Sequence, residues 1–208
     1  MSTQETSPEP KQDRARATRR RLLDAAGRSL CELGFAGTTT TVVAKRAGVS
    51  QGALYKHFRS KQQMIAATTE HLFKGLIEAF REAFSKAATG RDPIARALPS
   101  LWAVFVTPEL YAVVELYIAA RTDDGLREAL VPVLIQHREN LRAEAKALFP
   151  EAAEKNPRFD IVVDSLMAAL QGAAVSAAVL GEVQDAAQLG GFLEEMCRRE
   201  LQAPFGRV

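Results

Sequence analysis

The side chains best suited to chemistry are concentrated in one stretch, Thr39 to Lys61. Its second half holds an amide, a phenol, an imidazole and two amines, at Gln51, Tyr55, His57, Lys56 and Lys61. A Gln amide can bind adenine through two hydrogen bonds, and Tyr and Lys side chains can bind phosphates. This mixture indicates nucleic-acid contact. A plain helical hairpin with exposed polar residues is the alternative.

The same stretch contains a possible nucleophile. Residues 48–52 read Gly-Val-Ser-Gln-Gly, which fits the G-x-S-x-G pattern of hydrolases with Ser50 as the nucleophile. That pattern needs a buried strand before the serine, whereas residues 41–47, TVVAKRA, have the apolar spacing of a helix. We therefore expect Ser50 to cap a helix, and a serine hydrolase remains the enzymatic alternative.

Two short helices would position these side chains. Val43, Ala44 and Ala47 share one face of a first helix, and Leu54 and Phe58 share one face of a second. A glycine between them, at position 48, suits the positive φ at which helices often end. The pattern predicts a helix-turn-helix, whose second helix can enter a DNA major groove.

The first turn of that second helix would face base edges. It holds Gln51, Gly52 and Ala53, of which the Ala methyl could touch a thymine methyl. Gly52 costs about 1 kcal/mol of helix propensity relative to Ala, and a close approach to DNA would explain that cost. We expect Tyr55, Lys56 and the lysine at 61 to bind phosphates.

Composition supports a basic head on an acidic body. Residues 1–61 carry 12 Lys or Arg against 5 acids, and residues 62–208 carry 15 against 20. Cys31 and Cys197 lie far apart, which favours a reducing compartment over a disulfide framework. No secretory signal is evident, and the uncharged segment 165–181 is expected to be a buried helix and not a membrane span. We expect a cytoplasmic protein.

Capping residues, glycines and prolines predict helices along the rest of the chain. Residues 1–13 are expected to be disordered, and the arginine-rich segment 14–21 could follow a phosphate backbone or be a solvated tail. Gly34 and Gly181 are predicted helix stops, with Ser60 and Gln63 forming a capping box. Helices are expected at about 15–33, 39–47, 51–58, 61–88, 93–106, 108–121, 124–148, 157–181 and 184–201. Pro99 and Pro132 should kink or begin a helix. The fold class is all-α.

The segment GFAGTTTTVVAKRAGVSQGALYKHFRSKQQM, residues 34–64, resembles the TetR/AcrR family of transcriptional regulators, as does TRRRLLDAAGRSLCELG before it. The resemblance implies a DNA-binding domain at 18–64, a basic arm at 1–17 and a helical ligand-binding and dimerisation domain at 65–208. It also implies a homodimer that binds a palindromic operator and is released by a small molecule. The positions matching the family's DNA contacts are Thr39, Thr41, Gln51, Ala53, Tyr55, Lys56, His57 and Lys61. At position 41 the family often has a long basic residue, so Thr41 predicts a shorter phosphate contact or none.

The predicted body offers candidates for a ligand pocket. They combine aromatic walls with a few polar groups, and comprise Trp102, Phe105, Tyr111, Glu115, Ile118, His137, Met167 and Gln171. Each could equally be an ordinary core residue. Glu115 is the most informative, because a buried carboxylate needs a partner, which a cationic ligand could supply.

Small residues recur on the helix predicted at 157–181, and apolar residues recur on the last helix. They predict a two-helix face that pairs with its own copy, through Ala169, Gly172, Ala173, Ser176, Leu189, Leu193 and Met196. Packing within one chain is the alternative.

The sequence therefore predicts a ligand-responsive DNA-binding regulator, most simply a homodimeric repressor. Its expected partners are double-stranded DNA, a small-molecule effector and a second copy of the chain. No association with a membrane is expected. No catalysis, cofactor or metal is expected, since the three histidines are scattered and no C-x-x-C or H-x-x-x-H occurs. A helical protein-interaction module without DNA binding remains the third alternative.

Overall fold

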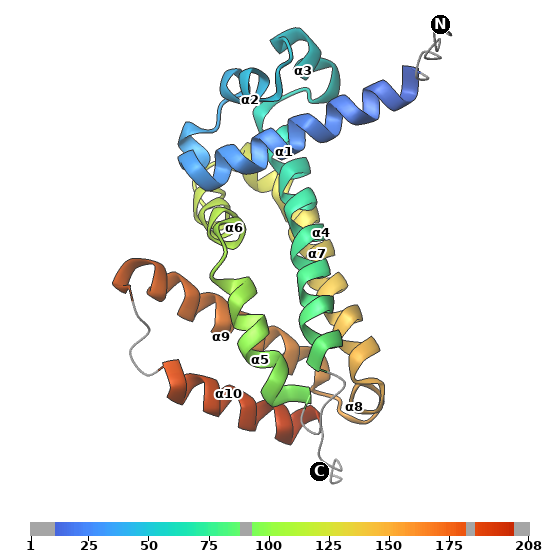
Figure 1. The fold of residues 1–208 in the computed structure, drawn as a ribbon, viewed down its shortest axis with the longest axis vertical. Helices are drawn as coiled ribbons and strands as arrows, with labels where there is room; N and C mark the ends of the chain where they lie inside the picture. The colour runs from blue at the N-terminus through green and yellow to red at the C-terminus, as the bar shows by residue number, and fades with distance from the viewer. Residues whose placement is uncertain (1–10, 88–92, 182–185, 202–208) are drawn as a thin grey trace, which may run out of the picture.

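The computed structural model describes residues 11–87, 93–181 and 186–201. Within these ranges the chain forms α-helices and no strand, which confirms the all-α class. Helices α1–α3 form a head at one end, α4 leads from it into the body, and α5–α10 complete the body (Figure 1). The bounds are α1 Lys11–Gly37, α2 Thr40–Ala47, α3 Gln51–His57, α4 Lys61–Ala87, α5 Pro93–Phe105, α6 Pro108–Ala119, α7 Asp124–Leu148, α8 Pro150–Lys155, α9 Phe159–Leu180 and α10 Ala186–Leu201.

The first helix begins earlier than predicted. Residues 11–17 of the expected disordered arm belong to α1, and residues 1–10 lie outside the described part of the chain. Arg, Ala, Lys and Gln, which dominate residues 11–17, are good helix formers, and Asp13 lies favourably in the first turn. The other end is as expected, because the helical backbone breaks at Gly34, where φ is 67°.

The predicted caps of the head helices are confirmed. Thr39 Oγ1 accepts a hydrogen bond from Val42 N at 3.2 Å, and Ser50 Oγ accepts one from Ala53 N at 3.1 Å. Gly48 ends α2 in the left-handed region, with φ at 63°. Ser50 follows a helix and caps another, so the strand that a hydrolase nucleophile requires is replaced by α2.

The N-terminus of α4 departs in one detail from the predicted capping box. Ser60 Oγ accepts from Gln63 N at 3.1 Å as expected. Gln63 Oε1, however, accepts from Arg59 N at 2.6 Å, one residue earlier than the reciprocal bond of the motif.

Most body helices lie within two residues of their predicted bounds. Helices α5 and α7 continue through Pro99 and Pro132, which lie inside them and do not begin them. The short helix α8 was not predicted, although Pro150 stands at its start, where proline is favoured. Gly181 ends α9 with φ at 81°, as expected.

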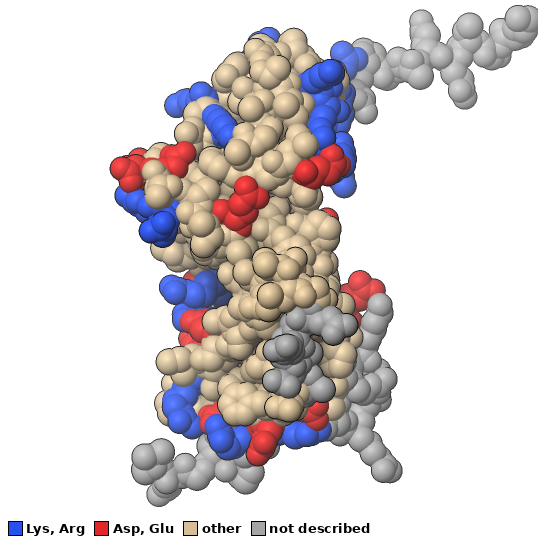
Figure 2. All heavy atoms as spheres, turned by 90° about the vertical axis from the view of Figure 1, so that its left-hand side faces the viewer, with Lys and Arg blue, Asp and Glu red and all other residues tan. Residues whose placement is uncertain are grey.

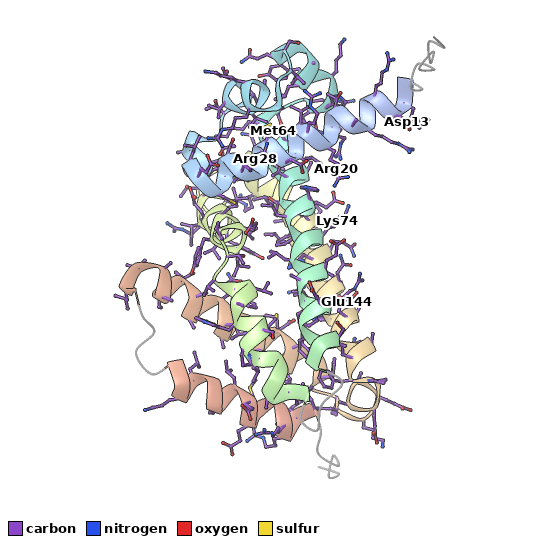
Figure 3. All side chains as sticks on the ribbon, in the orientation of Figure 1. Asp13, Arg20, Arg28, Met64, Lys74 and Glu144 are labelled. Carbon is purple, nitrogen blue, oxygen red and sulfur yellow. The ribbon has the colours of Figure 1, made fainter. Side chains whose placement is uncertain are left out.

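The long helices α4 and α7 run alongside each other and connect the head to the far end of the body (Figure 1). Arg81 of α4 donates a hydrogen bond from Nε to Glu144 of α7 at 2.7 Å (Glu144 is labelled in Figure 3). This bond and the neighbouring charge hold the pKa of Glu144 below its ordinary value. The Arg81–Glu144 contact therefore links α4 to α7 within the body.

The hydrophobic core nearest the head crosses the predicted domain boundary at residue 64. It joins Leu22, Val43, Leu54 and Phe58 of the head region to body residues of α6 and α7, such as Leu116. A second core lies deeper in the body and includes Phe80, Leu101 and Leu170. Helices α6 and α7 therefore pack directly against the head.

Helix α9 is long and apolar enough to span a membrane by length and composition alone. Only 28% of its most apolar window is buried within the chain, so the expectation of a buried helix holds for one face of α9 and not for the other. On the open side, Ile161, Val175, Val179 and Leu180 are exposed, as is Phe192 of the neighbouring α10. The core helix of a soluble protein passes the same test of length and composition, so this result alone is weak evidence for a membrane span.

Candidate nucleic-acid interface

The head presents the first turn of α3 to solvent. Gln51 and Gly52 are exposed, Ala53 is half-buried and Leu54 is completely buried against the head core. One side of α3 thus anchors the helix while the other remains open, at the end of the molecule farthest from α10 (Figure 1). This is the arrangement that the predicted base contacts of Gln51 and Ala53 require.

Helix α2 orients the polar side chains of α3. Gln51 Nε2 donates to Thr41 Oγ1, and the hydroxyls of Thr40 and Tyr55 lie 3.3 Å apart. Each contact uses only part of its side chain's hydrogen-bonding capacity, since a Gln amide has a second N–H and a carbonyl oxygen. The pairing with Gln51 also gives Thr41 a structural role that the sequence did not reveal.

The remaining predicted contacts differ in exposure. Lys56 is exposed, Tyr55 is 50% exposed and Thr39 is exposed at its capping position. His57 is half-buried beside Phe58, with 6.4 Å between their ring centroids. Thr39, Tyr55 and Lys56 can therefore reach a partner without a change in the head.

Lys61 is the exception, because its amine is used inside the protein. Lys61 Nζ donates to the backbone carbonyl of Phe35 at 2.9 Å and lies 4.2 Å from the centre of the Phe35 ring. Burial lowers its pKa from the ordinary value. The prediction that Lys61 binds phosphate does not fit this geometry, since a helix-end carbonyl and an aromatic ring already engage the cation.

The arginines of residues 14–21 divide into two groups. Arg21 donates to Ala47 O at 2.5 Å and to Gly48 O at 3.2 Å, and Arg19 lies 5.5 Å from the centre of the Phe58 ring. Arg14, Arg16 and Arg20 are exposed and have no ion pair with any described residue (Arg20 is labelled in Figure 3). The first group stabilises the head, and the second is free to bind phosphate.

Charge is unevenly distributed over the surface. On the face shown in Figure 2, Lys and Arg side chains border the upper end of the molecule, where the head lies, and Asp and Glu side chains lie below them. The head therefore offers a positive field to an anionic polymer, as the sequence composition indicated.

Glu115 lies at the joint between head and body and not in a ligand pocket. Its Oε1 accepts a hydrogen bond from Phe35 N at 2.7 Å, beside the break in α1. A Cβ atom added to Gly34 would lie 2.7 Å from the same oxygen. Exposure and this bond satisfy the carboxylate, so the predicted cationic ligand is not needed.

Four of the predicted ligand residues do line one cavity. Phe105, His137, Met167 and Gln171 border a space of about 250 Å³ between α4, α5, α6, α7 and α9. His137 stacks on Phe73 with 3.6 Å between ring centroids and 1° between ring planes. The structure therefore brings these four residues together at one cavity, and their contact with a ligand stays a prediction.

The sequence missed other residues of this cavity. Tyr117 projects from α6, and Arg138 and Asp164 supply its two formal charges. The signal available for Asp164 was a carboxylate among the apolar residues of α9, although Asp160 one turn earlier gives the same signal and does not line the cavity.

The other predicted ligand residues lie elsewhere. Trp102 borders a separate cavity of 220 Å³ with Leu189 and Glu194, between α5, α9 and α10. Tyr111 packs at the edge of the deeper core, and Ile118 is 65% exposed. Tyr111 and Ile118 therefore line neither cavity. Residue type suggested them as pocket residues, and residue type does not determine which face of α6 turns inward.

The predicted dimer residues also divide. Gly172 and Ser176 lie exposed on the open side of α9, whereas Ala169, Ala173, Leu189 and Met196 are half-buried. Leu193 is 3% exposed and belongs to the core of its own chain, so it is not available to a partner. Among the described large hydrophobic residues of α10, the exposed one is its neighbour Phe192.

Among the side chains that the structure describes, no group of three His, Cys, Asp or Glu residues is placed to hold a metal ion. Burial raises the pKa of Cys197 to about 11. That thiol is therefore protonated at neutral pH and has no nucleophilic character.

Known proteins resemble this chain in sequence and in fold. Residues 22–68 match the family of bacterial regulatory proteins named tetR. An uncharacterized HTH-type transcriptional regulator of Mycobacterium tuberculosis is 32% identical over 169 residues, covering 81% of this chain and 87% of that protein. The HTH-type transcriptional regulator BetI of Burkholderia ambifaria is 31% identical over 149 residues, covering 72% and 75%. In fold, a Rhodococcus transcriptional regulator has a TM-score of 0.67 at 24% identity, covering 88% of this chain and 96% of that one.

The head geometry and these relatives define a helix-turn-helix DNA-binding protein. The chain belongs to the TetR family of bacterial transcriptional regulators. Its relatives regulate transcription, which agrees with the capping role of Ser50 and not with a hydrolase.

Proposed function

We propose that the protein is a homodimeric repressor that binds a palindromic operator and releases it when a small molecule enters the body. It acts in the cytoplasm by binding and without catalysis. The observation that carries the proposal is the exposed first turn of α3, with Gln51 held beside Thr41 and with Tyr55 and Lys56 open on the same helix. Gln51 and Ala53 face base edges, while Thr39, Tyr55 and Lys56 bind phosphates.

A dimer follows from the need for two heads. Recognition helices that read successive major grooves must be about 34–36 Å apart, which one head cannot provide. The open face of α9, with Gly172 and Ser176 among exposed apolar residues, supports pairing with a second copy. Phe192 of the neighbouring α10 is a further exposed apolar side chain that a second copy could cover.

Ligand binding is coupled to the head through α6 and α4. Both helices border the 250 Å³ cavity, at Tyr117 and Phe73, and both hold the backbone of Phe35. A ligand that favours a different arrangement of α6 and α4 would thereby shift the population of head positions. The multidrug binding protein EbrR, which has been crystallised with imidazole and with ethidium, shares this fold at 21% identity and a TM-score of 0.66, and it covers 91% of this chain and 98% of its own.

The test is selection of duplexes from a random DNA pool by the purified full chain, with the oligomeric state measured on the selected site. The proposal expects an inverted repeat, two chains per site and an affinity that falls steeply with salt. The variant Phe192→Glu places a charge on the proposed dimer surface, so it should give monomers with much weaker operator binding. Recovery of unrelated sequences, or sequence-specific binding by a monomer, would overturn the proposal.

A further inference from the structure

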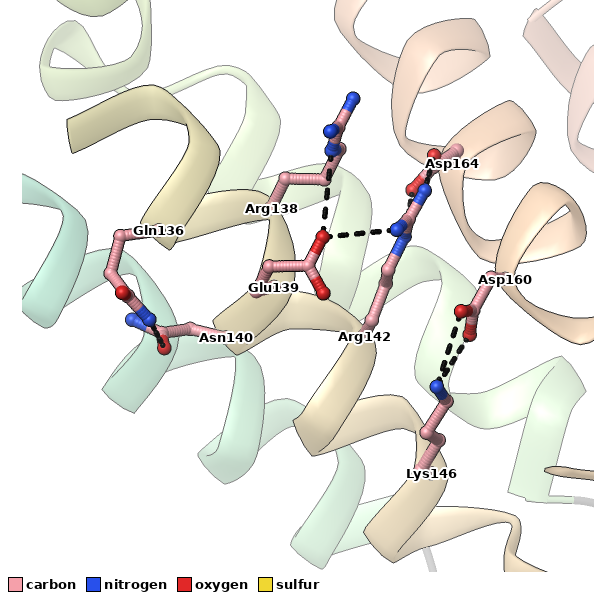
Figure 4. Close-up of polar contacts among 8 residues, drawn as sticks. All are labelled: Gln136, Arg138, Glu139, Asn140, Arg142, Lys146, Asp160 and Asp164. Carbon is pink, nitrogen blue, oxygen red and sulfur yellow. Dashed lines mark hydrogen bonds and ion pairs between the residues drawn. The ribbon is translucent and has the colours of Figure 1, made fainter. Parts of the chain in front are cut away.

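The body cavity has walls that are electrically neutral as a whole. Its two formal charges are Arg138 and Asp164, and the rest of the lining is aromatic, aliphatic or neutral polar. Arg142 binds the Asp164 carboxylate through two hydrogen bonds, from Nε at 3.0 Å and from Nη2 at 2.5 Å. Arg138 Nε lies 3.9 Å from a carboxylate oxygen of Glu139 (Figure 4).

The ion pair with Arg142 leaves no free charge at Asp164, and the side chain of Arg138 is 55% exposed, so water solvates the Arg138 charge at the rim of the cavity. The bidentate geometry between Arg142 and Asp164 is the strong form of a carboxylate–guanidinium contact, and it occupies both carboxylate oxygens. A cationic ligand would compete with Arg142 for Asp164. An anionic ligand would lose its hydration beside a carboxylate that is already satisfied.

His137 does not change this balance. Burial lowers its pKa to about 4, so the imidazole is neutral at neutral pH. Its Nδ1 is buried and has no hydrogen-bond partner among the described residues. The stacked ring of Phe73 extends the imidazole into a flat aromatic wall.

The lining also contains neutral hydrogen-bonding groups. The Tyr117 hydroxyl and the Gln171 amide border the same space as Phe105 and Met167. Polar groups of this kind orient a ligand within an apolar site.

We propose that this cavity takes an uncharged aromatic ligand bearing a hydroxyl or carbonyl group, and that the ion pair between Arg142 and Asp164 determines this selectivity for charge. The inference rests on the proposed effector function and names the chemical class of that effector. It assigns Arg142 a specificity role although Asp164 alone of the pair borders the cavity.

The neighbouring ion pair provides a control. Asp160 lies one turn before Asp164 on α9 and is paired with Lys146 of α7, with 2.9 Å between Lys146 Nζ and Asp160 Oδ1 (Figure 4). Both pairs join the same two helices. Asp160 does not line the cavity, so changes there alter the joint between the helices but not the ligand's surroundings.

The experiment uses three probes with one aromatic skeleton, namely 2-naphthol, 2-naphthoate and 2-naphthylmethylammonium, near neutral pH. Calorimetric titration of the full chain should show 2-naphthol binding at least about tenfold more tightly than either ion. Leu141→Phe, which fills the cavity, should abolish this binding, whereas Leu148→Phe, two turns along the same helix, should retain it. Equal binding of the three probes, or binding of none, would overturn the inference.

Charge variants make the test reciprocal. Asp164→Asn should admit 2-naphthoate and Arg142→Gln should admit the ammonium probe, each with a gain of at least about tenfold, while Asp160→Asn and Lys146→Gln should change neither preference. Because the two variants predict opposite gains, loss of folding in one leaves the other decisive. The specificity role of the Arg142–Asp164 pair would be contradicted if Asp164→Asn did not gain affinity for 2-naphthoate and Arg142→Gln did not gain affinity for the ammonium probe.

Operator release is measured separately from binding. If 2-naphthol binds selectively but leaves DNA affinity unchanged, the chemical class stands and the proposed effector function fails. If an ion binds the wild-type cavity and releases DNA, the effector function stands and the chemical class fails.

Discussion

The backbone of Phe35 is held from two sides, because Glu115 accepts its N–H at 2.7 Å while Lys61 donates to its carbonyl oxygen at 2.9 Å. Phe35 follows the break in α1 at Gly34. Glu115 belongs to α6 of the body, and Lys61 begins α4. The peptide groups at the end of the first head helix are thus tied to both helices that lead toward the cavity.

The contact between Glu115 and Phe35 predicts a coupled pair of substitutions. Glu115→Ala should lower the free energy of unfolding by about 1–2 kcal/mol, because it removes a charge-assisted hydrogen bond at a partly solvated site. Gly34→Ala should cost at least about 1 kcal/mol, because φ is 67° there and the new Cβ would lie 2.7 Å from Glu115 Oε1.

A double-mutant cycle by urea unfolding measures the coupling. With the carboxylate removed, Gly34→Ala no longer has its steric conflict and retains only the backbone strain. The combined variant should therefore be more stable than the sum of the two single changes indicates. Strict additivity would show that the close approach to Glu115 is not what restricts position 34.

Neighbouring arginines of α1 should behave differently. Arg21→Ala should lower the free energy of unfolding by about 1 kcal/mol, because it removes hydrogen bonds to the carbonyls of Ala47 and Gly48. Arg20→Ala should leave unfolding unchanged and weaken DNA binding, and the salt slope of log affinity should fall by about 1 for each phosphate that Arg20 neutralises. Chemical unfolding and DNA titrations at several salt concentrations separate the two effects. An equal effect of both substitutions on stability would contradict this division.

The lysines of the head predict a second contrast. Lys56→Met should weaken DNA binding and lower its salt dependence without affecting folding, because Lys56 is exposed. Lys61→Met should chiefly lower stability, because the amine is bonded to Phe35 O inside the head. Chemical unfolding measures the change in stability, and DNA titrations at several salt concentrations measure the change in binding. A reduced salt slope for Lys61→Met with unchanged stability would restore Lys61 to the phosphate contacts.

His137 predicts a dependence of stability on pH. Its folded pKa of about 4 lies below the ordinary 6.5, so the unfolded chain binds a proton that the folded chain does not between these values. Stability should therefore fall as pH drops through this window, by up to about 3 kcal/mol from this residue. Urea unfolding between these pH values should show a shallower dependence for His137→Gln than for the wild type. Identical pH profiles for the two proteins would contradict the neutral, buried imidazole.

Local signals in the sequence were sufficient for the head. Thr39, Gly48 and Ser50 act through contacts within a few residues, so cap and turn chemistry located α2 and α3 correctly. The same locality explains why Gly34 and Gly181 were correct helix ends. The conformations of these residues depend on neighbours in the sequence, so they can be predicted without the rest of the fold.

Contacts between segments far apart in the sequence could not be predicted from caps and turns, because these depend only on neighbouring residues. Glu115 and Phe35 are 80 residues apart, and Lys61 and Phe35 are 26 apart. Helical periodicity identifies an apolar stripe but not its neighbour, which is why Ile118 and Leu193 were assigned to surfaces that they do not form. The charge of a side chain likewise does not reveal whether it binds DNA or a carbonyl within the chain.

Base reading by α3 is tested most sharply by comparing the DNA sequence preferences of the wild type and Gln51→Ala. The variant should show no preference at one symmetry-related base pair in each half-site. The cost should be about 1–3 kcal/mol per half-site, with an unchanged salt slope. An unchanged sequence preference in Gln51→Ala would contradict the assignment of Gln51 as a base reader.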